Sequence, residues 1–273
     1  MLVIIAAAAV LGTLSPPEVR ACVGRPADMN WSAIAAEKAK ISQADWRDAC
    51  RQARDADERR RSTVRVIRAT GASPVGGYGA SLGWIRKQKA ARTPEAAELL
   101  RLATEDQLAR DSLSMNRAPA ARGLSPLARR IYDLVVSSDA IKADAASRAW
   151  LKETVARRGW FTISRDGEDA DAAAQLVVQH ADEDLTFKGE MIALIEPLVE
   201  KGESRRSFFP YLYDRWAAAA HKPLRFGLQG ACKGKGLWEP LPTEDPEHLE
   251  ERRQTFGLES FALQQNRENT RCP

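Results

Sequence analysis

Residues 95–111 read EAAELLRLATEDQLARD, a stretch that predicts an amphipathic helix with Pro94 in its first turn. At about 100° per residue, one arc of this helix is apolar and consists of Leu99, Leu100, Leu102 and Ala103. The opposite arc is charged and consists of Glu98, Arg101 and Glu105. The stretch therefore predicts a helix that packs against a core on one side and faces water on the other.

Three polar residues interrupt the apolar arc: Asp106, Gln107 and Arg110. A charge buried among apolar groups must be paired, because an unpaired one costs several kcal/mol. One interpretation is an Asp106–Arg110 ion pair at the helix end, and the other is a clamp for a ligand. On this helix alone, the ion pair is favoured.

The rest of the chain predicts more helices and little sheet. Alanine and arginine are abundant while valine, isoleucine and threonine are sparse, a balance that favours helix. The expected helices cover residues 31–68 (with Asn30 as N-cap), 126–135, 139–158, 168–181, 185–201, 207–220 and 244–255. We expect a loop at 71–83 and at most a short hairpin near 224–238. The predicted fold is mainly α, with a compact multi-helix domain at 91–273 and an N-terminal helical region at 22–90.

The first residues predict export. Leu2 to Leu14 form an apolar run of about 13 residues, too short to span a bilayer but suited to a signal peptide. Pro16 and Pro17 are expected to break this helix, and Val19-Arg20-Ala21 fits cleavage after Ala21. We therefore expect a signal peptide at 1–21 and a periplasmic or secreted location. The alternative is a buried N-terminal helix.

The four cysteines are Cys22, Cys50, Cys232 and Cys272. In an exported chain they predict disulfides, and of the three pairings the most local joins Cys22 to Cys50 and Cys232 to Cys272. A lipid anchor on Cys22 is disfavoured, because Arg20 stands where lipid-modified sequences have small or apolar residues. After the leader, no apolar stretch predicts a membrane span.

The net charge of +4 is small, and both signs are mixed along the chain. The densest basic run is Arg59-Arg60-Arg61, followed by Arg65 and Arg68. No aromatic platform or nucleic-acid motif accompanies the run. A solvated helix face is therefore favoured over contact with a polyanion, and no nucleic-acid partner is expected.

Two other helices contribute candidate site residues. His180 shares a face with the packed side of the helix at 168–181, and three carboxylates, Asp182, Glu183 and Asp184, follow it. An acidic neighbour would orient the histidine ring and raise its proton affinity, although the cluster is also explained as a solvated cap. Arg215 lies at the edge of an apolar arc in 207–220, where it predicts an anchored anion or stacking on Trp216 or Phe208.

These residues stand in an order that resembles a known family. The matching motifs are Glu105-Asp106-Gln107-x-x-Arg110, Val177-Val178-Gln179-His180-Ala181-Asp182, Tyr211-Leu212-x-Asp214-Arg215 and Phe226-Gly227-x-Gln229. Over about residues 95–262 the chain is similar to the domain-of-unknown-function family 6624, a largely bacterial group. The resemblance implies a helical domain with shared polar positions at Asp106, Gln107, Arg110, Gln179, His180, Asp182, Asp214, Arg215 and Gln229, and it implies no known activity. The chain departs from the family at Phe226 and Leu228, where hydroxyl-bearing residues are usual, and at Arg225, where a glutamine is usual.

Three functions remain open at this point. The first is a hydrolase or transferase for a small polar or anionic substrate, with His180, Asp182 and Asp106 as catalytic residues and His180 as general acid or base. The second is a binding module for an anionic or polar ligand, and the third is a buried polar network that fixes helix register. Under the first two, the expected ligand-binding residues are Gln107, Arg110, Gln179, Asp214, Arg215 and Gln229. No cofactor and no metal are expected, and the oligomeric state is left open.

Overall fold

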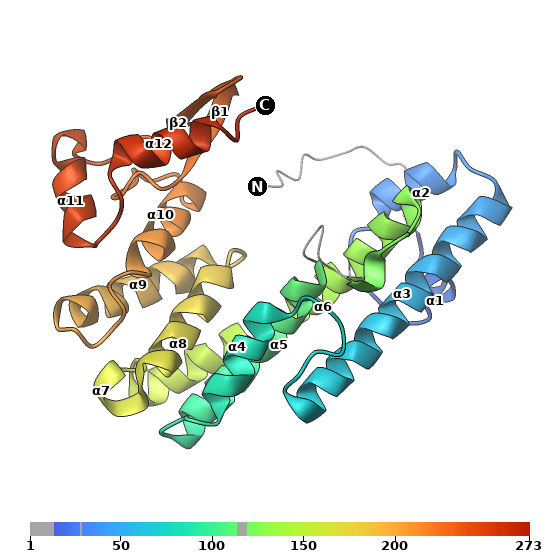
Figure 1. The fold of residues 1–273 in the computed structure, drawn as a ribbon, viewed down its shortest axis with the longest axis horizontal. Coiled ribbons are helices and arrows are strands. Elements are labelled where there is room, and N and C mark those ends of the chain that lie inside the picture. Colours follow the sequence, from blue (N-terminus) through green and yellow to red (C-terminus); the bar gives the residue numbers. More distant parts are fainter. Residues whose placement is uncertain (1–13, 28, 114–118) are drawn as a thin grey trace. The chain divides into compact units, whose positions relative to one another are not determined.

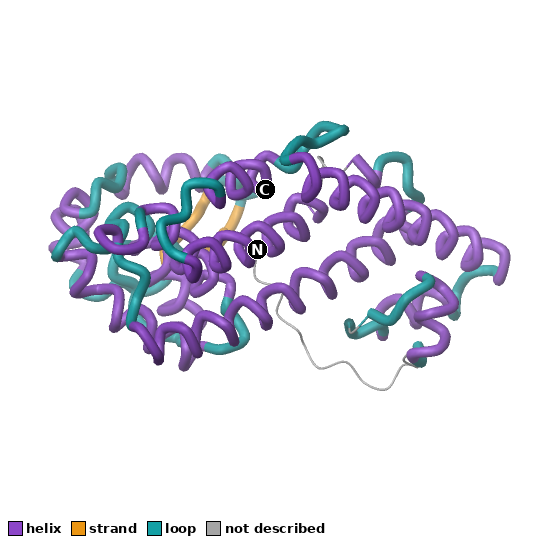
Figure 2. Tube along the Cα trace, turned by 90° about the horizontal axis from the view of Figure 1, so that it is seen from below, coloured by secondary structure: helices purple, strands orange, loops and turns teal. Residues whose placement is uncertain are grey.

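The computed structural model describes residues 14–27, 29–113 and 119–273, and helices make up most of this part (Figure 1). Within it, strands occur in one two-stranded antiparallel sheet (Figure 2). The predicted fold class, mainly α with a short hairpin, is therefore confirmed. No helix in the described ranges combines the length and apolar character that a bilayer span needs. Residues 1–13 of the predicted leader lie outside the described residues.

The chain divides into two compact units, and three helices contribute to both. The first unit consists of Met1–Arg86 and Thr104–Ala143, and the second of Lys87–Ala103 and Asp144–Pro273. The change at 86/87 falls inside α4 (Gly79–Gln88). The change at 103/104 falls inside α5 (Pro94–Leu113), and the change at 143/144 falls inside α6 (Pro126–Arg158). The sequence predicted an N-terminal region at 22–90 and a domain at 91–273. It did not predict that helices are shared between the units.

The long helix α3 (Gln43–Thr70) is the main element of the first unit. The other elements are α1 (Pro16–Val23), α2 (Ser32–Lys38), most of α4 (Gly79–Gln88), η1 (Pro119–Ala121) and the adjoining parts of α5 and α6. Both α1 and η1 pack against α3. A buried apolar core includes Val19, Ile34, Trp46, Ala53 and Ile131.

The predicted single helix over 31–68 is wrong, because a turn at residues 39–42 separates α2 from α3. Ser42 caps α3, and its Oγ accepts a hydrogen bond from the backbone N–H of Asp45 at 3.1 Å. The predicted N-cap of α2 is also displaced by one residue. Trp31 occupies that position, while Asn30 Oδ1 accepts a hydrogen bond from the backbone N–H of Ser32 at 2.9 Å.

Three other predicted boundaries change. The two helices expected at 126–135 and 139–158 are the single 33-residue helix α6. Gly71, with a φ of +68°, ends α3 as the glycine-rich segment predicts, but α4 begins inside the predicted loop. Pro16 and Pro17 begin α1, and the predicted cleavage after Ala21 falls within this helix.

The second unit contains three helices that contact one another, together with an aromatic cluster that includes Phe209 and Tyr213. Its elements after α6 are α7 (Ile163–Asp166), α8 (Glu168–His180), α9 (Leu185–Glu200), α10 (Phe209–Ala219), β1 (Gly230–Gly234), β2 (Leu237–Pro240), η2 (Pro246–His248), α11 (Leu249–Thr255) and α12 (Phe261–Asn269). Helices α8, α9 and α10 contact one another. Phe226 packs edge-on against Phe209, Tyr213 and Phe256, which anchors the segment after α10 to this core.

The hairpin lies at 230–240, slightly later than the predicted 224–238. Gly230 pairs with Pro240, and a Cβ at Gly230 would lie 2.3 Å from the carbonyl oxygen of Glu239. A larger residue there would push the strands apart. The helix predicted at 244–255 is present as η2 and α11, whereas α12 was not predicted.

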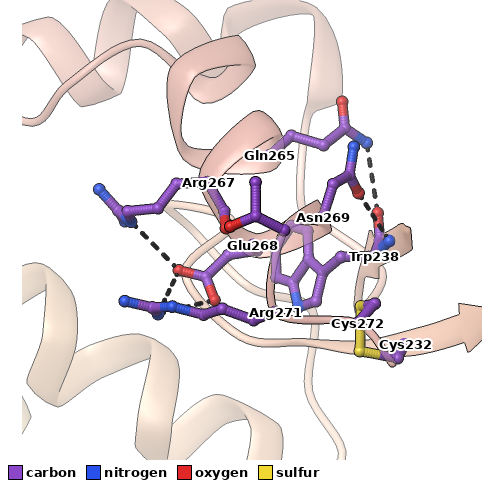
Figure 3. The surroundings of a disulfide bond; sticks show 9 residues. Cys232, Trp238, Gln265, Arg267, Glu268, Asn269, Arg271 and Cys272 are labelled. Carbon is purple, nitrogen blue, oxygen red and sulfur yellow. Dashed lines mark hydrogen bonds and ion pairs between the residues drawn. A yellow bond between two sulfur atoms is a disulfide. The ribbon is translucent and has the colours of Figure 1, made fainter. Parts of the chain in front are cut away.

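Both disulfides follow the local pairing. Cys22–Cys50 joins α1 to α3, and Cys232–Cys272 joins β1 to the end of the chain. Figure 3 shows the second disulfide beside Trp238, whose backbone N–H donates to the Asn269 side chain at 2.7 Å. The bond therefore closes a 40-residue segment over the hairpin and α12.

We expect the Cys232→Ser/Cys272→Ser double variant to lose about 4 kcal/mol of unfolding free energy, because a closed loop of this length restricts the unfolded chain. Urea unfolding monitored by tryptophan fluorescence measures the loss. The Cys22→Ser/Cys50→Ser variant, which opens a 28-residue loop in the first unit, gives a matched comparison. An unchanged urea midpoint for either variant would show that its disulfide adds no stability.

Candidate functional site

The polar end of α5 forms the ion pair that its spacing predicts. Asp106 is buried, and its Oδ1 accepts a hydrogen bond from Arg110 Nε at 2.7 Å. Gln107 Nε2 donates to the other carboxylate oxygen at 2.7 Å. These three residues belong to the first unit, while the other six predicted site residues belong to the second. Their expected convergence on one pocket stays a prediction.

In the second unit, Asp182 forms ion pairs with two cationic side chains, Lys188 and Arg215. Lys188, whose side chain is 0% exposed, donates from Nζ to Asp182 Oδ1 at 2.6 Å and to the Gln179 carbonyl at 2.8 Å. Arg215 binds the same carboxylate through two nitrogens, with Nε at 3.0 Å from Oδ1. The anion that Arg215 anchors is therefore the protein's own Asp182, and no stacking on Trp216 or Phe208 is needed to explain it.

Burial and ion pairing oppose each other in this network. Partial burial alone would raise the pKa of Asp182, but the hydrogen bonds from Arg215 and Lys188 hold it well below its usual range. Burial lowers the pKa of Lys188, and Asp182 counters this effect. The carboxylate is thus ionised at neutral pH, and it compensates the buried ammonium.

His180, at the C-terminal end of α8, lies near a carboxylate that the sequence analysis did not consider. A ring nitrogen of His180 and a carboxylate oxygen of Asp144 lie within 4.8 Å of each other, and both residues are half-buried. A carboxylate at this position can orient the imidazole ring. The pair supplies two of the three protein ligands that a catalytic zinc site uses.

Asp214 and Gln229 serve the backbone of the segment after α10. Asp214 is 0% exposed, and its carboxylate accepts hydrogen bonds from the backbone N–H groups of Arg225, Phe226 and Leu228. Burial raises the pKa of Asp214, and these three donors oppose the rise. The carbonyl oxygen of Gln229 accepts from Leu241 N at 2.9 Å. These contacts fix the approach to the hairpin.

A cationic pocket of about 470 Å³ lies entirely in the first unit. Five arginines and a lysine line it, against two carboxylates and a few apolar side chains. The lining residues are Arg25, Arg60, Arg61, Val64, Arg65, Arg68, Glu105, Leu108, Ala109, Asp139, Lys142 and Ala143. Four arginines of the basic run seen in the sequence, Arg60, Arg61, Arg65 and Arg68, therefore line a cavity, a result that the favoured solvated-face interpretation did not anticipate.

The inner side of the cationic pocket is a network of ion pairs between two arginines and two carboxylates. Arg25 donates to Asp139 through Nη1 and Nη2 at 2.8 Å, and to the buried Asp57 through Nε at 3.0 Å. Arg60 also bridges Asp57 and Asp139, at 2.6 Å to each. Although burial alone would lower the pKa of Arg25 and of Arg60, these carboxylates raise both values. Both arginines therefore stay charged.

The outer side of the pocket is a row of three arginines on α3. Arg61 is 3.2 Å from Asp57, and Arg68 is paired with Glu105, with Nε and Oε1 2.9 Å apart. Within the described residues, Arg65 has no ion-pair partner and is exposed. The row therefore keeps an excess of positive charge that the protein itself does not neutralise.

Sequence reasoning missed the residues that define these arrangements. Arg25, Asp57 and Asp139 are far apart in the chain, and nothing in their local pattern links them. The sequence contained one indication of the role of Lys188, since this residue stands six residues after Asp182 on a largely apolar helix. It contained no indication that Asp144 lies near His180.

Comparison with known proteins adds no relative: no family model, curated protein or solved structure matches this chain. Membership of the domain-of-unknown-function family 6624 therefore stays a prediction. Function has to be argued from the residues themselves.

We expect Asp182→Asn to lower the unfolding free energy by about 2 kcal/mol, because the buried Lys188 ammonium loses its carboxylate. The Asp182→Asn/Lys188→Met double variant should regain most of this loss, since no unpaired buried charge remains. Urea unfolding is measured for the wild type, Asp182→Asn, Lys188→Met and the double variant. These four unfolding free energies give the coupling energy between the two residues. Losses that simply add in the double variant would show that the pair is not coupled.

The same carboxylate predicts a pH dependence. Because folding lowers the pKa of Asp182, its contribution to stability is full above the unfolded value of about 4 and is lost as the pH falls further. The stability difference between the wild type and Asp182→Asn should therefore shrink between pH 6 and pH 3. A constant difference over this range, measured by urea unfolding, would contradict the assignment.

Proposed function

We propose that this protein is an exported binding module whose first unit holds an anionic ligand in the cationic pocket. The observation that carries the proposal is the row of Arg61, Arg65 and Arg68 along a cavity of about 470 Å³. Guanidinium groups bind carboxylates and phosphates through paired hydrogen bonds. The volume lies in the range of small-molecule sites, about 300–1,000 Å³.

The inner ion pairs support this proposal by fixing the shape of the pocket. Arg25 and Arg60 use their donors on Asp57 and Asp139, so they form a rigid wall and leave ligand contact to the outer row. Preformed sites lose less conformational entropy when a ligand binds. The sequence left two interpretations of the basic run, a solvated helix face and contact with a polyanion. The proposal favours contact with a polyanion.

Two disulfides are consistent with an oxidising compartment outside the cytosol. Together with the leader expected at residues 1–21, they support a periplasmic or secreted location. The proposed ligand is therefore one that is present outside the cytosol.

The Asp144–His180 pair favours a second candidate function, acid–base catalysis in a hydrolase or transferase. His180 would move the proton and Asp144 would orient its ring. If the protein hydrolyses p-nitrophenyl phosphate, His180→Gln should reduce kcat by about 100-fold. Equal rates for the wild type and His180→Gln would eliminate this role.

We expect Arg65→Gln to weaken pyrophosphate binding about fivefold, as one exposed ion pair contributes about 1 kcal/mol. Isothermal titration calorimetry on the full chain at low salt measures the affinity. Arg122→Gln is the matched control, because Arg122 is an exposed arginine of the same unit that does not line the pocket. Equal affinities for the two variants would place pyrophosphate somewhere other than the cationic pocket.

A further inference from the structure

The spacing of the outer arginines indicates how many charges a ligand of the cationic pocket carries. Arg61, Arg65 and Arg68 are spaced i, i+4 and i+7 on α3, so they share one face of the helix. From the first to the third, the helix rises about 10 Å. One phosphate or carboxylate group can reach one or two of these guanidiniums but not the whole row.

The inner wall offers no extra place for a lone anion. Asp139 already occupies Arg25 through two nitrogens, and it also occupies Arg60. The protein's own carboxylate thus fills the position that a single bound anion would take. Net attraction for a ligand is left to the outer row, where the charges follow one another along the helix.

The lining also indicates what the ligand lacks. Apart from charged groups, the described residues that line the cationic pocket are Val64, Leu108, Ala109 and Ala143, and none of these is aromatic. Nucleobases are usually bound on aromatic platforms or by stacking. The pocket therefore suits a flexible chain of charges better than a nucleotide.

Glu105 competes for one end of the row. Its carboxylate pairs with Arg68, and its side chain is 28% exposed. A ligand that extends over all three arginines has to replace this carboxylate on Arg68. The ion pair thus holds Arg68 in place within the pocket, and it lowers the affinity of Arg68 for a ligand.

Resting on the proposed function, we infer that the ligand is a short linear polyanion without aromatic rings. It lies along α3 with successive anionic groups on Arg61, Arg65 and Arg68, and it displaces Glu105. Polyphosphate chains and acidic oligosaccharides share this chemistry.

The test compares ligands of increasing charge on the full chain by isothermal titration calorimetry. The probes are inorganic phosphate, tripolyphosphate, ATP, galacturonate and trigalacturonate. We expect tripolyphosphate or trigalacturonate to bind at least tenfold more tightly than its single-group counterpart, and the tighter of the two chains identifies the source. ATP should bind no more tightly than tripolyphosphate, because the base finds no platform.

Four variants and one control variant locate the bound chain. Arg61→Gln, Arg65→Gln and Arg68→Gln should each weaken binding of the tighter chain severalfold, whereas Arg122→Gln should not. Glu105→Gln should tighten it severalfold by releasing Arg68. An unchanged or weaker affinity for Glu105→Gln would overturn the placement on Arg68.

The failure of this inference is distinguishable from that of the proposed function. If phosphate binds as tightly as tripolyphosphate, galacturonate binds as tightly as trigalacturonate, and both depend on Arg65, the cationic pocket is an anion site but the polyanion inference is wrong. ATP binding tenfold more tightly than tripolyphosphate would also overturn it. If no probe binds in an Arg65-dependent way, both proposals fail.

Discussion

The first unit depends on two arginines that are shared between two carboxylates. Arg25 follows α1, Asp57 and Arg60 lie on α3, and Asp139 lies on α6, with up to 114 residues between partners. Charges that are taken out of water cost several kcal/mol unless each finds a partner. These ion pairs therefore link the three segments, because each of the four groups contacts two groups of opposite charge.

This constraint determines what the unit offers to a ligand. With Asp57 and Asp139 committed to the inner wall, little negative charge remains to neutralise the arginines on the outer face of α3. The second unit uses its buried polar groups differently. Asp214 gathers backbone N–H groups, Lys188 joins Asp182 to the end of α8, and the buried Arg253 donates to carbonyls of Phe226 and Glu259. These groups stabilise turns, so several polar residues that looked like ligand contacts in the sequence have a structural use.

Local patterns predicted local structure well and predicted the site poorly. Periodicity placed α5, α8, α9 and α10 within a few residues, and i, i+4 spacing predicted the Asp106–Arg110 pair. It failed where Ser42 caps a new helix within a stretch rich in charged residues, and where α6 continues as one helix through Ser137, Ser138 and Asp139. The cationic pocket could not be predicted, since its wall joins Arg25 to Asp139 and sequence alone gave no register between them. The basic run itself was visible, but its role depended on these distant partners.

Ligand binding by the first unit requires that a solvent-facing row of arginines on α3 remains available after the inner ion pairs form. Nitrogen-15 NMR of the arginine Nε–Hε groups, recorded while tripolyphosphate is added to the full chain, tests it most directly. We expect saturable shifts for Arg61, Arg65 and Arg68, and an unmoved signal for Arg122. Shifts spread evenly over the exposed arginines, or absent from these three, would contradict it.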